Sequence, residues 1–286
     1  MSIGAVIFDF NGVLVDDESV HFALFREVLA QEGVVITERD YHQRYLGYDD
    51  RGCFEAALHD AGQSADRGRL DELIARKARR YVEVAEQGLR FFPAAAETLG
   101  AVASRWPVAI CSGALRSEIE YALRRLGCLD QVAAIISAED TDKCKPDPEG
   151  YRLALAALRA CRGRPPVVDS NVCPPGGHSG LPSAGAGTPT ELASCDCLVI
   201  EDSLAGIISA KGAGMWAVGV ATTYDADQLR QAGADAVVDA LATLTPAWIS
   251  SLVIRGSAPP GAGQQDPIPS RLMTMGGVRR QTTNDE

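Results

Sequence analysis

The stretch AVIFDFNGVL, residues 5–14, decides the fold, because its apolar run ends abruptly in a carboxylate. Residues 3–8 show no alternation of polar and apolar side chains, which predicts a strand buried on both faces of a parallel sheet. Asp9 then lies at the carboxyl end of this strand, where open α/β sheets place their ligand sites. Gly12 allows the chain to turn sharply just after the strand.

A carboxylate held at a strand tip can act as a nucleophile, as a metal ligand, or as both. An aspartate in front of Asn-Gly also occurs where a strand simply ends in a turn. Asp9 alone leaves both interpretations open, and the order of the residues downstream has to decide between them.

Composition excludes several classes of partner. The chain has 286 residues, enough for one large domain or two unequal ones, and 46% of them are hydrophobic and 23% charged, as in ordinary globular proteins. Its net charge of −11 argues against a nucleic-acid or anionic-membrane partner, because phosphate-rich surfaces attract basic faces.

The cysteines and the apolar runs predict a cytoplasmic protein. Eight cysteines are scattered along the chain without a CxxC pair, which favours reduced thiols over a disulfide framework or a zinc site. Asp9 interrupts the N-terminal apolar run, so we expect no signal peptide there. No apolar run approaches the length of a membrane span.

Residues 17–88 contain helical patterns and no strand candidate. A helical block that follows the first strand predicts a small cap domain inserted into the main fold. The patterns cover residues 20–29, 38–45, 53–61 and 69–86, with a loop expected over 45–51.

Beyond residue 89, short apolar runs alternate with helical patterns. This alternation predicts a doubly wound, Rossmann-like parallel sheet with right-handed crossovers, formed by residues 1–16 and 89–250. The expected strands cover residues 108–111, 132–137, 197–202, 216–220 and 236–238.

Two segments are rich in proline and glycine and break this pattern. Residues 162–196 are crowded with Pro, Gly and Ser, which predicts a surface loop or a disordered insertion. Residues 256–286 are predicted to form a disordered tail.

Polar groups follow three of the predicted strands, at Asp9, Ser112 and Glu201-Asp202. The carboxyl ends of parallel strands meet at one edge, so we expect these groups to gather there. Ser112 and Gly113 are expected to open a helix over 115–126 and to bind an anion with their backbone N–H groups. Two carboxylate tips repel each other unless a cation lies between them, and oxygen ligands suit Mg²⁺.

Each of these residues also has an ordinary structural interpretation. Ser112 can be a plain helix N-cap, and Asp202 can cap the helix that starts at Leu204. Lys145 can neutralise a phosphate and Asp9 together, but a loop lysine is usually just solvated.

The ordered set resembles the haloacid dehalogenase-like superfamily, specifically its β-phosphoglucomutase-like and phosphoglycolate-phosphatase-like branch with a helical cap. The resemblance covers about residues 3–240, without the insertion. It rests on DFNGV at 9–13, ICSG at 110–113, KPDP at 145–148 and VIEDSLAGI at 199–207.

The resemblance implies a role for each matching residue. Asp9 corresponds to the family nucleophile, which accepts the phosphoryl group as an aspartyl-phosphate. Ser112 and Lys145 correspond to the pair that holds the phosphate. The implied Mg²⁺ ligands are Asp9, the backbone carbonyl of Asn11 and Asp202, with Glu201 either a ligand or directly behind the ligands.

The resemblance also implies substrate contacts from the cap. Gly47 and Arg51 resemble the cap loop of the mutase-like branch, where the arginine grips the distal side of the substrate. His21 and Lys77 fall where that branch places polar substrate contacts, and Gly113 follows the phosphate-holding serine. For His21, Arg51 and Lys77, exposed helix residues without a site role are the alternative.

Asn11 departs from the pattern of most phosphatases in this family, which have an aspartate there as the general acid and base. An amide has no titratable proton at working pH, and losing such a group costs about 10²–10⁴-fold in rate. The metal role survives, because it uses the backbone carbonyl. If the rest of the machinery is intact, Asn11→Asp is expected to raise the rate strongly.

The primary functional hypothesis is a Mg²⁺-dependent phosphatase for a small phosphorylated metabolite, slow or specialised because of Asn11 and present as a monomer or weak homodimer. His21 or Asp16 is a candidate for the missing acid. A sugar-phosphate mutase and a non-catalytic phosphometabolite-binding protein are the alternatives. A dehalogenase is a more remote alternative, because halide displacement needs no cation and would give Glu201 and Asp202 no metal to bind.

Overall fold

The computed structural model describes residues 3–46, 48–161 and 192–252. A six-stranded, all-parallel sheet in the order β3-β2-β1-β4-β5-β6 forms its centre. The strands are β1 Ala5–Phe8, β2 Val108–Cys111, β3 Ala134–Ile136, β4 Cys197–Glu201, β5 Trp216–Val220 and β6 Ala236–Val238.

Strand β1 lies in the middle of the sheet, where an apolar strand can be covered on both faces. All four of its residues are apolar and buried. It pairs with β2 on one side and with β4 on the other. The chain winds outward from β1 in both directions, so the order reverses at the β1–β4 pair. This is the doubly wound α/β fold that the sequence predicts, and ligand sites form at such a reversal.

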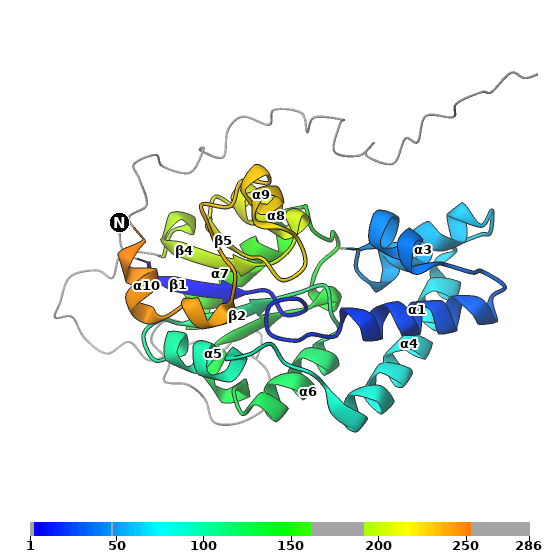
Figure 1. The fold of residues 1–286 in the computed structure, drawn as a ribbon, viewed down its shortest axis with the longest axis horizontal. Helices are drawn as coiled ribbons and strands as arrows, with labels where there is room; N and C mark the ends of the chain where they lie inside the picture. The colour runs from blue at the N-terminus through cyan, green and yellow to red at the C-terminus, as the bar shows by residue number, and fades with distance from the viewer. Residues whose placement is uncertain (1–2, 47, 162–191, 253–286) are drawn as a thin grey trace, which may run out of the picture.

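Helices cover both faces of the sheet (Figure 1). Alternate residues of β1 point to opposite faces: Val6 and Phe8 pack with α5, α6 and α10, and Ala5 and Ile7 pack with α7, α8 and α9. These helices are α5 Ala95–Ala103, α6 Arg116–Leu126, α7 Glu149–Cys161, α8 Leu204–Gly212, α9 Ala226–Gln231 and α10 Pro246–Ser251. Short helical turns occupy Leu129–Gln131, Ala138–Asp140, Ser194–Asp196 and Leu241–Thr243.

The helical cap lies beside the carboxyl ends of the strands (Figure 1). Its helices α1, α3 and α4 share a separate hydrophobic cluster that includes Phe25, Phe54 and Leu73. The cap elements are α1 Glu18–Gln31, α2 Glu38–Asp40, the π-helix Tyr41–Tyr45, α3 Asp50–Asp60 and α4 Arg67–Gly88.

Two neighbouring backbone segments connect the cap to the sheet domain. Val15 pairs with Phe91 in an antiparallel bridge, and the N–H of Asp16 donates to the carbonyl of Arg90 at 3.0 Å. The N–H of Phe92 donates to the carbonyl of Leu14 at 3.1 Å. The entry and exit of the cap are therefore held side by side.

The structure corrects several predicted boundaries. The helix expected over 38–45 becomes one α-helical turn followed by a π-helix, and α3 starts at Asp50, inside the expected loop. Leu192 is buried against the core and Ser194–Asp196 forms a helical turn, so the expected insertion ends before 192. Residues 162–191 and the tail 256–286 lie outside the described residues. Within the described part, none of the helices has the length and apolarity to cross a bilayer.

Candidate active site

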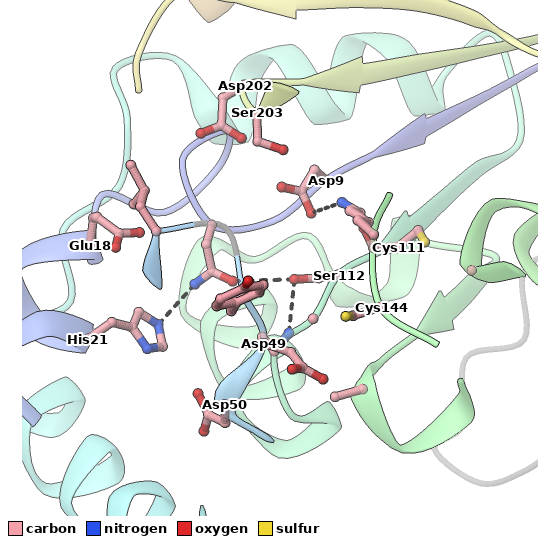
Figure 2. A pocket seen from close by; sticks show the side chains of 18 of the residues that line it. Asp9, Glu18, His21, Asp49, Asp50, Cys111, Ser112, Cys144, Asp202 and Ser203 are labelled. Atoms are coloured by element: carbon pink, nitrogen blue, oxygen red, sulfur yellow. Dashed lines mark hydrogen bonds and ion pairs between the residues drawn. The ribbon is translucent and has the colours of Figure 1, made fainter. Parts of the chain in front are cut away.

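A pocket lies between the carboxyl edge of the sheet and the cap (Figure 2). Asp9, Ser112 and Asp202 line it from the strand ends. Glu18, His21, Asp49 and Asp50 line it from α1 and the start of α3. The strand tips thus meet at one place, as the sequence predicts.

Lys145 joins two carboxylates at the base of the pocket. Its Nζ donates to Oδ1 of Asp9 at 2.8 Å and to Oε1 of Glu201 at 2.6 Å. Burial acts to lower the pKa of Lys145, but the two carboxylates outweigh it and raise this pKa well above its usual value. The lysine is therefore a fixed positive charge and not a solvated loop residue.

Glu201 is fully buried, and both of its carboxylate oxygens are occupied. Oε1 accepts from Lys145 and from the hydroxyl of Tyr151 at 3.0 Å, and Oε2 accepts from the N–H and the hydroxyl of Ser203. A Cβ on Gly206 would lie 1.6 Å from Oε1, so only glycine leaves room for this carboxylate. These contacts suit a residue that holds Lys145 and the 201–203 turn in place.

Asp202 lies close to Asp9 and does not cap the next helix. Ser203 is the N-cap of α8, and its hydroxyl accepts from the N–H of Gly206 at 3.0 Å. The Asp202 carboxylate lies against Gly12, where an added Cβ would stand 2.0 Å from Oδ2. Gly12 has a φ of +76°, so the turn and the close approach both require glycine.

The donor set fits a hard divalent cation. Oxygens of Asp9, Glu201 and Asp202 lie within 4.8 Å of one another, all buried. When all three carboxylates are ionised they face one ammonium group, which leaves two negative charges uncompensated. Burial, opposed by Lys145 and reinforced by Glu201, raises the pKa of Asp9 to about 7. Burial, with Glu201 and Asp9, raises the pKa of Asp202 well above its usual value. Mg²⁺ would offset this repulsion with the oxygen ligands that it prefers.

Ser112 lies next to this cluster, in a different local structure from the one expected. Helix α6 begins at Arg116, one residue after the predicted start, and Leu115 is its N-cap, so Ser112 is not the helix N-cap. Anion binding by residues 112 and 113 stays a prediction. Its hydroxyl accepts from the N–H of Ala114 at 3.1 Å and donates to Oδ1 of Asn11 at 3.3 Å. Gly113 lines the pocket beside it and lies close to Asp49 of the cap.

The amide of Asn11 is held at both of its polar atoms. Oδ1 accepts from Ser112, and Nδ2 lies 3.0 and 3.1 Å from the two carboxylate oxygens of Asp17. Nδ2 also lies 3.2 Å from Nε2 of His21. Asn11 is therefore an ordered part of the site.

His21 lines the pocket, whereas Arg51 and Lys77 do not. His21 is 8% exposed and stacks on Tyr81, with ring centroids 5.2 Å apart. The structure does not place Arg51 or Lys77 in the pocket, and each has an acidic partner, so their contact with the substrate stays a prediction. Arg51 pairs with Asp71 on the cap surface, and Lys77 is fully buried with Nζ 2.5 Å from Oδ1 of Asp50. Gly47 lies outside the described residues.

The cap side of the pocket combines acids and aromatic rings. Glu18 accepts from the hydroxyl of Tyr41 at 2.6 Å, and Asp50 has one buried oxygen, Oδ2, without a hydrogen-bond partner among the described residues. Among the described cap residues that line the pocket, His21 is the only basic one.

Sequence reasoning missed Asp17, Tyr81 and Tyr151. Asp17 was visible only as part of an acidic patch, DDE at 16–18, where nothing separates a buried carboxylate from two more solvated ones. Tyr81 and Tyr151 lie in ordinary helical patterns, so no local signal could have identified their site contacts.

The chain belongs to the haloacid dehalogenase-like hydrolase family, whose model matches residues 3–214. This match covers most of the sheet domain and the whole cap, and it confirms the resemblance seen in the sequence.

Two curated relatives carry phosphatase names. The validoxylamine A 7′-phosphate phosphatase of Streptomyces hygroscopicus subsp. limoneus is 29% identical over 234 residues, which cover 79% of this chain and 89% of the relative. The phosphorylated carbohydrates phosphatase of Thermotoga maritima is 30% identical over 237 residues, which cover 82% and 93%. The family resemblance to phosphatases therefore extends over nearly their full length.

A solved structure shows the same fold. The β-phosphoglucomutase of Clostridium difficile superposes with a TM-score of 0.68 at 20% identity, over 87% of this chain and 96% of the mutase. At this identity the similarity supports the α/β core with a helical cap and says nothing of the reaction.

Proposed function

We propose that this chain is a Mg²⁺-dependent, cytoplasmic phosphatase that hydrolyses a small phosphorylated metabolite through an aspartyl-phosphate on Asp9. The observation that carries the proposal is the Asp9 carboxylate, held by Lys145 at 2.8 Å inside a pocket that also presents Ser112 and Asp202. The phosphatase names of two relatives that are similar over most of their length support the same activity.

The proposed reaction has two steps. An oxygen of Asp9 forms a bond to phosphorus while the bond from phosphorus to the ester oxygen breaks, and the leaving oxygen takes a proton from solvent. Water then attacks phosphorus and gives up a proton to solvent, and the bond from phosphorus to Asp9 breaks, which releases inorganic phosphate and restores the carboxylate. Lys145 and the Ser112 hydroxyl hold the equatorial oxygens, and Mg²⁺ supplies further positive charge when bound.

Asn11 makes the leaving group decisive. Its amide cannot supply the proton, so alcohols that leave poorly should react slowly. Aryl phosphates and acyl phosphates, whose leaving groups need little protonation, should react faster. The lack of an acid at position 11 favours a specialised phosphatase. The same lack is why a non-catalytic phosphate-binding protein is the second candidate.

The charges of the cap favour a monophosphate substrate. Arg51 and Lys77 are both engaged by aspartates, and Glu18, Asp49 and Asp50 face the pocket. A second phosphate on the substrate would meet these carboxylates. This disfavours a mutase that must handle a bisphosphate, and it favours a distal portion rich in hydrogen-bond donors.

The test is phosphate release from a panel of phosphate monoesters and acyl phosphates with Mg²⁺, for the wild type and Asp9→Asn. Asp130→Asn, at an exposed aspartate that does not line the pocket, is the matched control. We expect turnover in the wild type and the control, and a loss of about 10³-fold or more in Asp9→Asn. Wild-type protein that binds phosphate esters without turnover would establish the second candidate instead.

A further inference from the structure

Asp17 occupies the N-cap position of the first cap helix, yet its side chain does not cap that helix. Aspartate is among the best N-cap residues, and an N-cap carboxylate normally accepts from a backbone N–H of the first turn. Here the side chain is fully buried and accepts no hydrogen bond from a backbone N–H of the helix. Something else therefore compensates this buried charge.

Three side chains from three elements supply the compensation. Asn11, in the loop after β1, places its Nδ2 at 3.0 and 3.1 Å from the two oxygens. Tyr81 of α4 donates its hydroxyl to Oδ2 at 2.6 Å, and Nε2 of His21 lies 3.2 Å from the same oxygen. Burial acts to raise the pKa of Asp17, but His21 and these hydrogen bonds outweigh it and lower this pKa.

We propose that Asp17 is a positioning residue, which orients the Asn11 amide and connects the cap to the phosphate-holding Ser112. The connection runs from Tyr81 through Asp17 to Asn11, whose Oδ1 accepts from Ser112 at 3.3 Å. Because Asp17 lies where the chain enters the cap, the placement of α4 and the orientation of Asn11 depend on one carboxylate. The catalytic part of this inference rests on the proposed phosphatase function.

The same geometry explains why position 11 carries an amide. A carboxylate at position 11 would face the Asp17 carboxylate at about the present hydrogen-bond distance, and like charges at that distance repel strongly. Nε2 of His21, 3.2 Å from both Nδ2 of Asn11 and Oδ2 of Asp17, would be the one donor among the described residues that the two carboxylates share. Position 11 and position 17 are therefore coupled: one carboxylate and one amide satisfy each other, and two carboxylates do not. Asn11→Asp alone should not restore a general acid and base.

The experiment is a cycle of wild type, Asn11→Asp, Asp17→Asn and the double variant, with Asp130→Asn as an exposed control. Melting temperatures come first. We expect Asn11→Asp to lower the melting temperature. The double variant should melt at a higher temperature than Asn11→Asp, because it again pairs one carboxylate with one amide, with the two positions exchanged. If the effects of the two single substitutions simply add in the double variant, the coupling is refuted.

Kinetics separate positioning from a merely structural role. The ratio of kcat for an alkyl phosphate to kcat for p-nitrophenyl phosphate does not depend on the fraction of folded enzyme. We expect this ratio to rise at least about tenfold from Asn11→Asp to the double variant, since a correctly held carboxylate can then protonate the poor leaving group. An equal or higher ratio in Asn11→Asp alone would overturn the positioning role.

The two proposals fail in different ways. If the wild type and every variant release no phosphate, the phosphatase function and the catalytic part of this inference fall together. The melting cycle would still decide the Asn11–Asp17 coupling, because it needs no turnover. If the wild type is active and the cycle is additive, only the inference about Asp17 falls.

Discussion

Nζ of Lys145 lies 2.8 Å from Oδ1 of Asp9, although 136 residues of chain separate them. The lysine comes from the loop before α7 and the aspartate from the end of the central strand. This contact places a fixed cation beside the proposed nucleophile, and the first prediction follows from it.

Lys145→Met is expected to destabilise the fold and to abolish phosphate release. Removing the ammonium group leaves Asp9 and Glu201 without their shared partner, and breaking such a buried pair costs about 3–5 kcal/mol. Chemical denaturation with and without Mg²⁺ measures the loss. Lys143→Met, at a largely exposed lysine that also lines the pocket, is the control for stability alone and should lose less than about 1 kcal/mol. Equal losses in the two variants would contradict the role of Lys145.

Mg²⁺ is expected to raise the melting temperature of the wild type. Binding to the folded state alone contributes about 2.7 kcal/mol at a concentration 100 times Kd. Asp202→Asn removes one buried carboxylate from the cluster, so the metal-free variant should melt higher than the metal-free wild type and respond less to Mg²⁺. If the melting temperature of Asp202→Asn still responds to Mg²⁺ as the wild type does, the ion binds elsewhere. A chelator is expected to abolish phosphate release by the wild type.

Comparing Gly12→Ala with Gly33→Ala distinguishes the cost of left-handed backbone strain from the cost of overlap with the Asp202 carboxylate. Both glycines have positive φ, +76° and +73°, so each alanine costs about 1–2 kcal/mol of left-handed strain. A Cβ at Gly33 meets nothing within 4 Å, whereas one at Gly12 would overlap the Asp202 carboxylate. Gly12→Ala should therefore be the more destabilising and should also lose the Mg²⁺-dependent thermal shift. Similar unfolding free energies and intact Mg²⁺ shifts in both variants would refute this.

Glu118→Gln is expected to stabilise the protein at neutral pH and to have little effect in acid. Burial, opposed by Lys77, raises the pKa of Glu118 above its usual 4.5, and its Oε1 accepts no hydrogen bond from any described residue. Between pH 4.5 and the folded-state pKa, the folded protein holds more protons than the unfolded chain, so stability falls as pH rises. The neutral glutamine removes this loss.

Melting curves between pH 4 and 8 measure the effect of Glu118. Glu120→Gln is the control, because Glu120 is more accessible and pairs with Arg124 on the helix surface. The gain from Glu118→Gln should grow as pH rises through this range, while the control stays nearly flat. A gain in melting temperature that is largest at pH 4 would contradict the raised pKa of Glu118.

The strand ends were the most predictable part of the site. A buried parallel strand requires a continuous apolar run, so the position where the run stops is written in the sequence, and Asp9 and Asp202 could be placed from it. The start of α3 was harder: the helix was expected from residue 53 but begins at Asp50, where the side chain of Asp49 accepts from the N–H of Gly52. The ion pairs of Arg51 and Lys77 could not be predicted from the sequence, because their partners, Asp71 and Asp50, come from other turns of the cap.

The sequence by itself determined the parallel sheet, the helical block after the first strand and the family, because these depend on periodicity and on short motifs with fixed spacing. Only the tertiary structure decided which charges meet. Asp16 and Asp17 are adjacent and chemically identical, yet one pairs with Arg90 at the surface and the other is buried against Asn11 and Tyr81. That difference depends on the packing of α4 against the chain at the entry to the cap, and no local pattern encodes it.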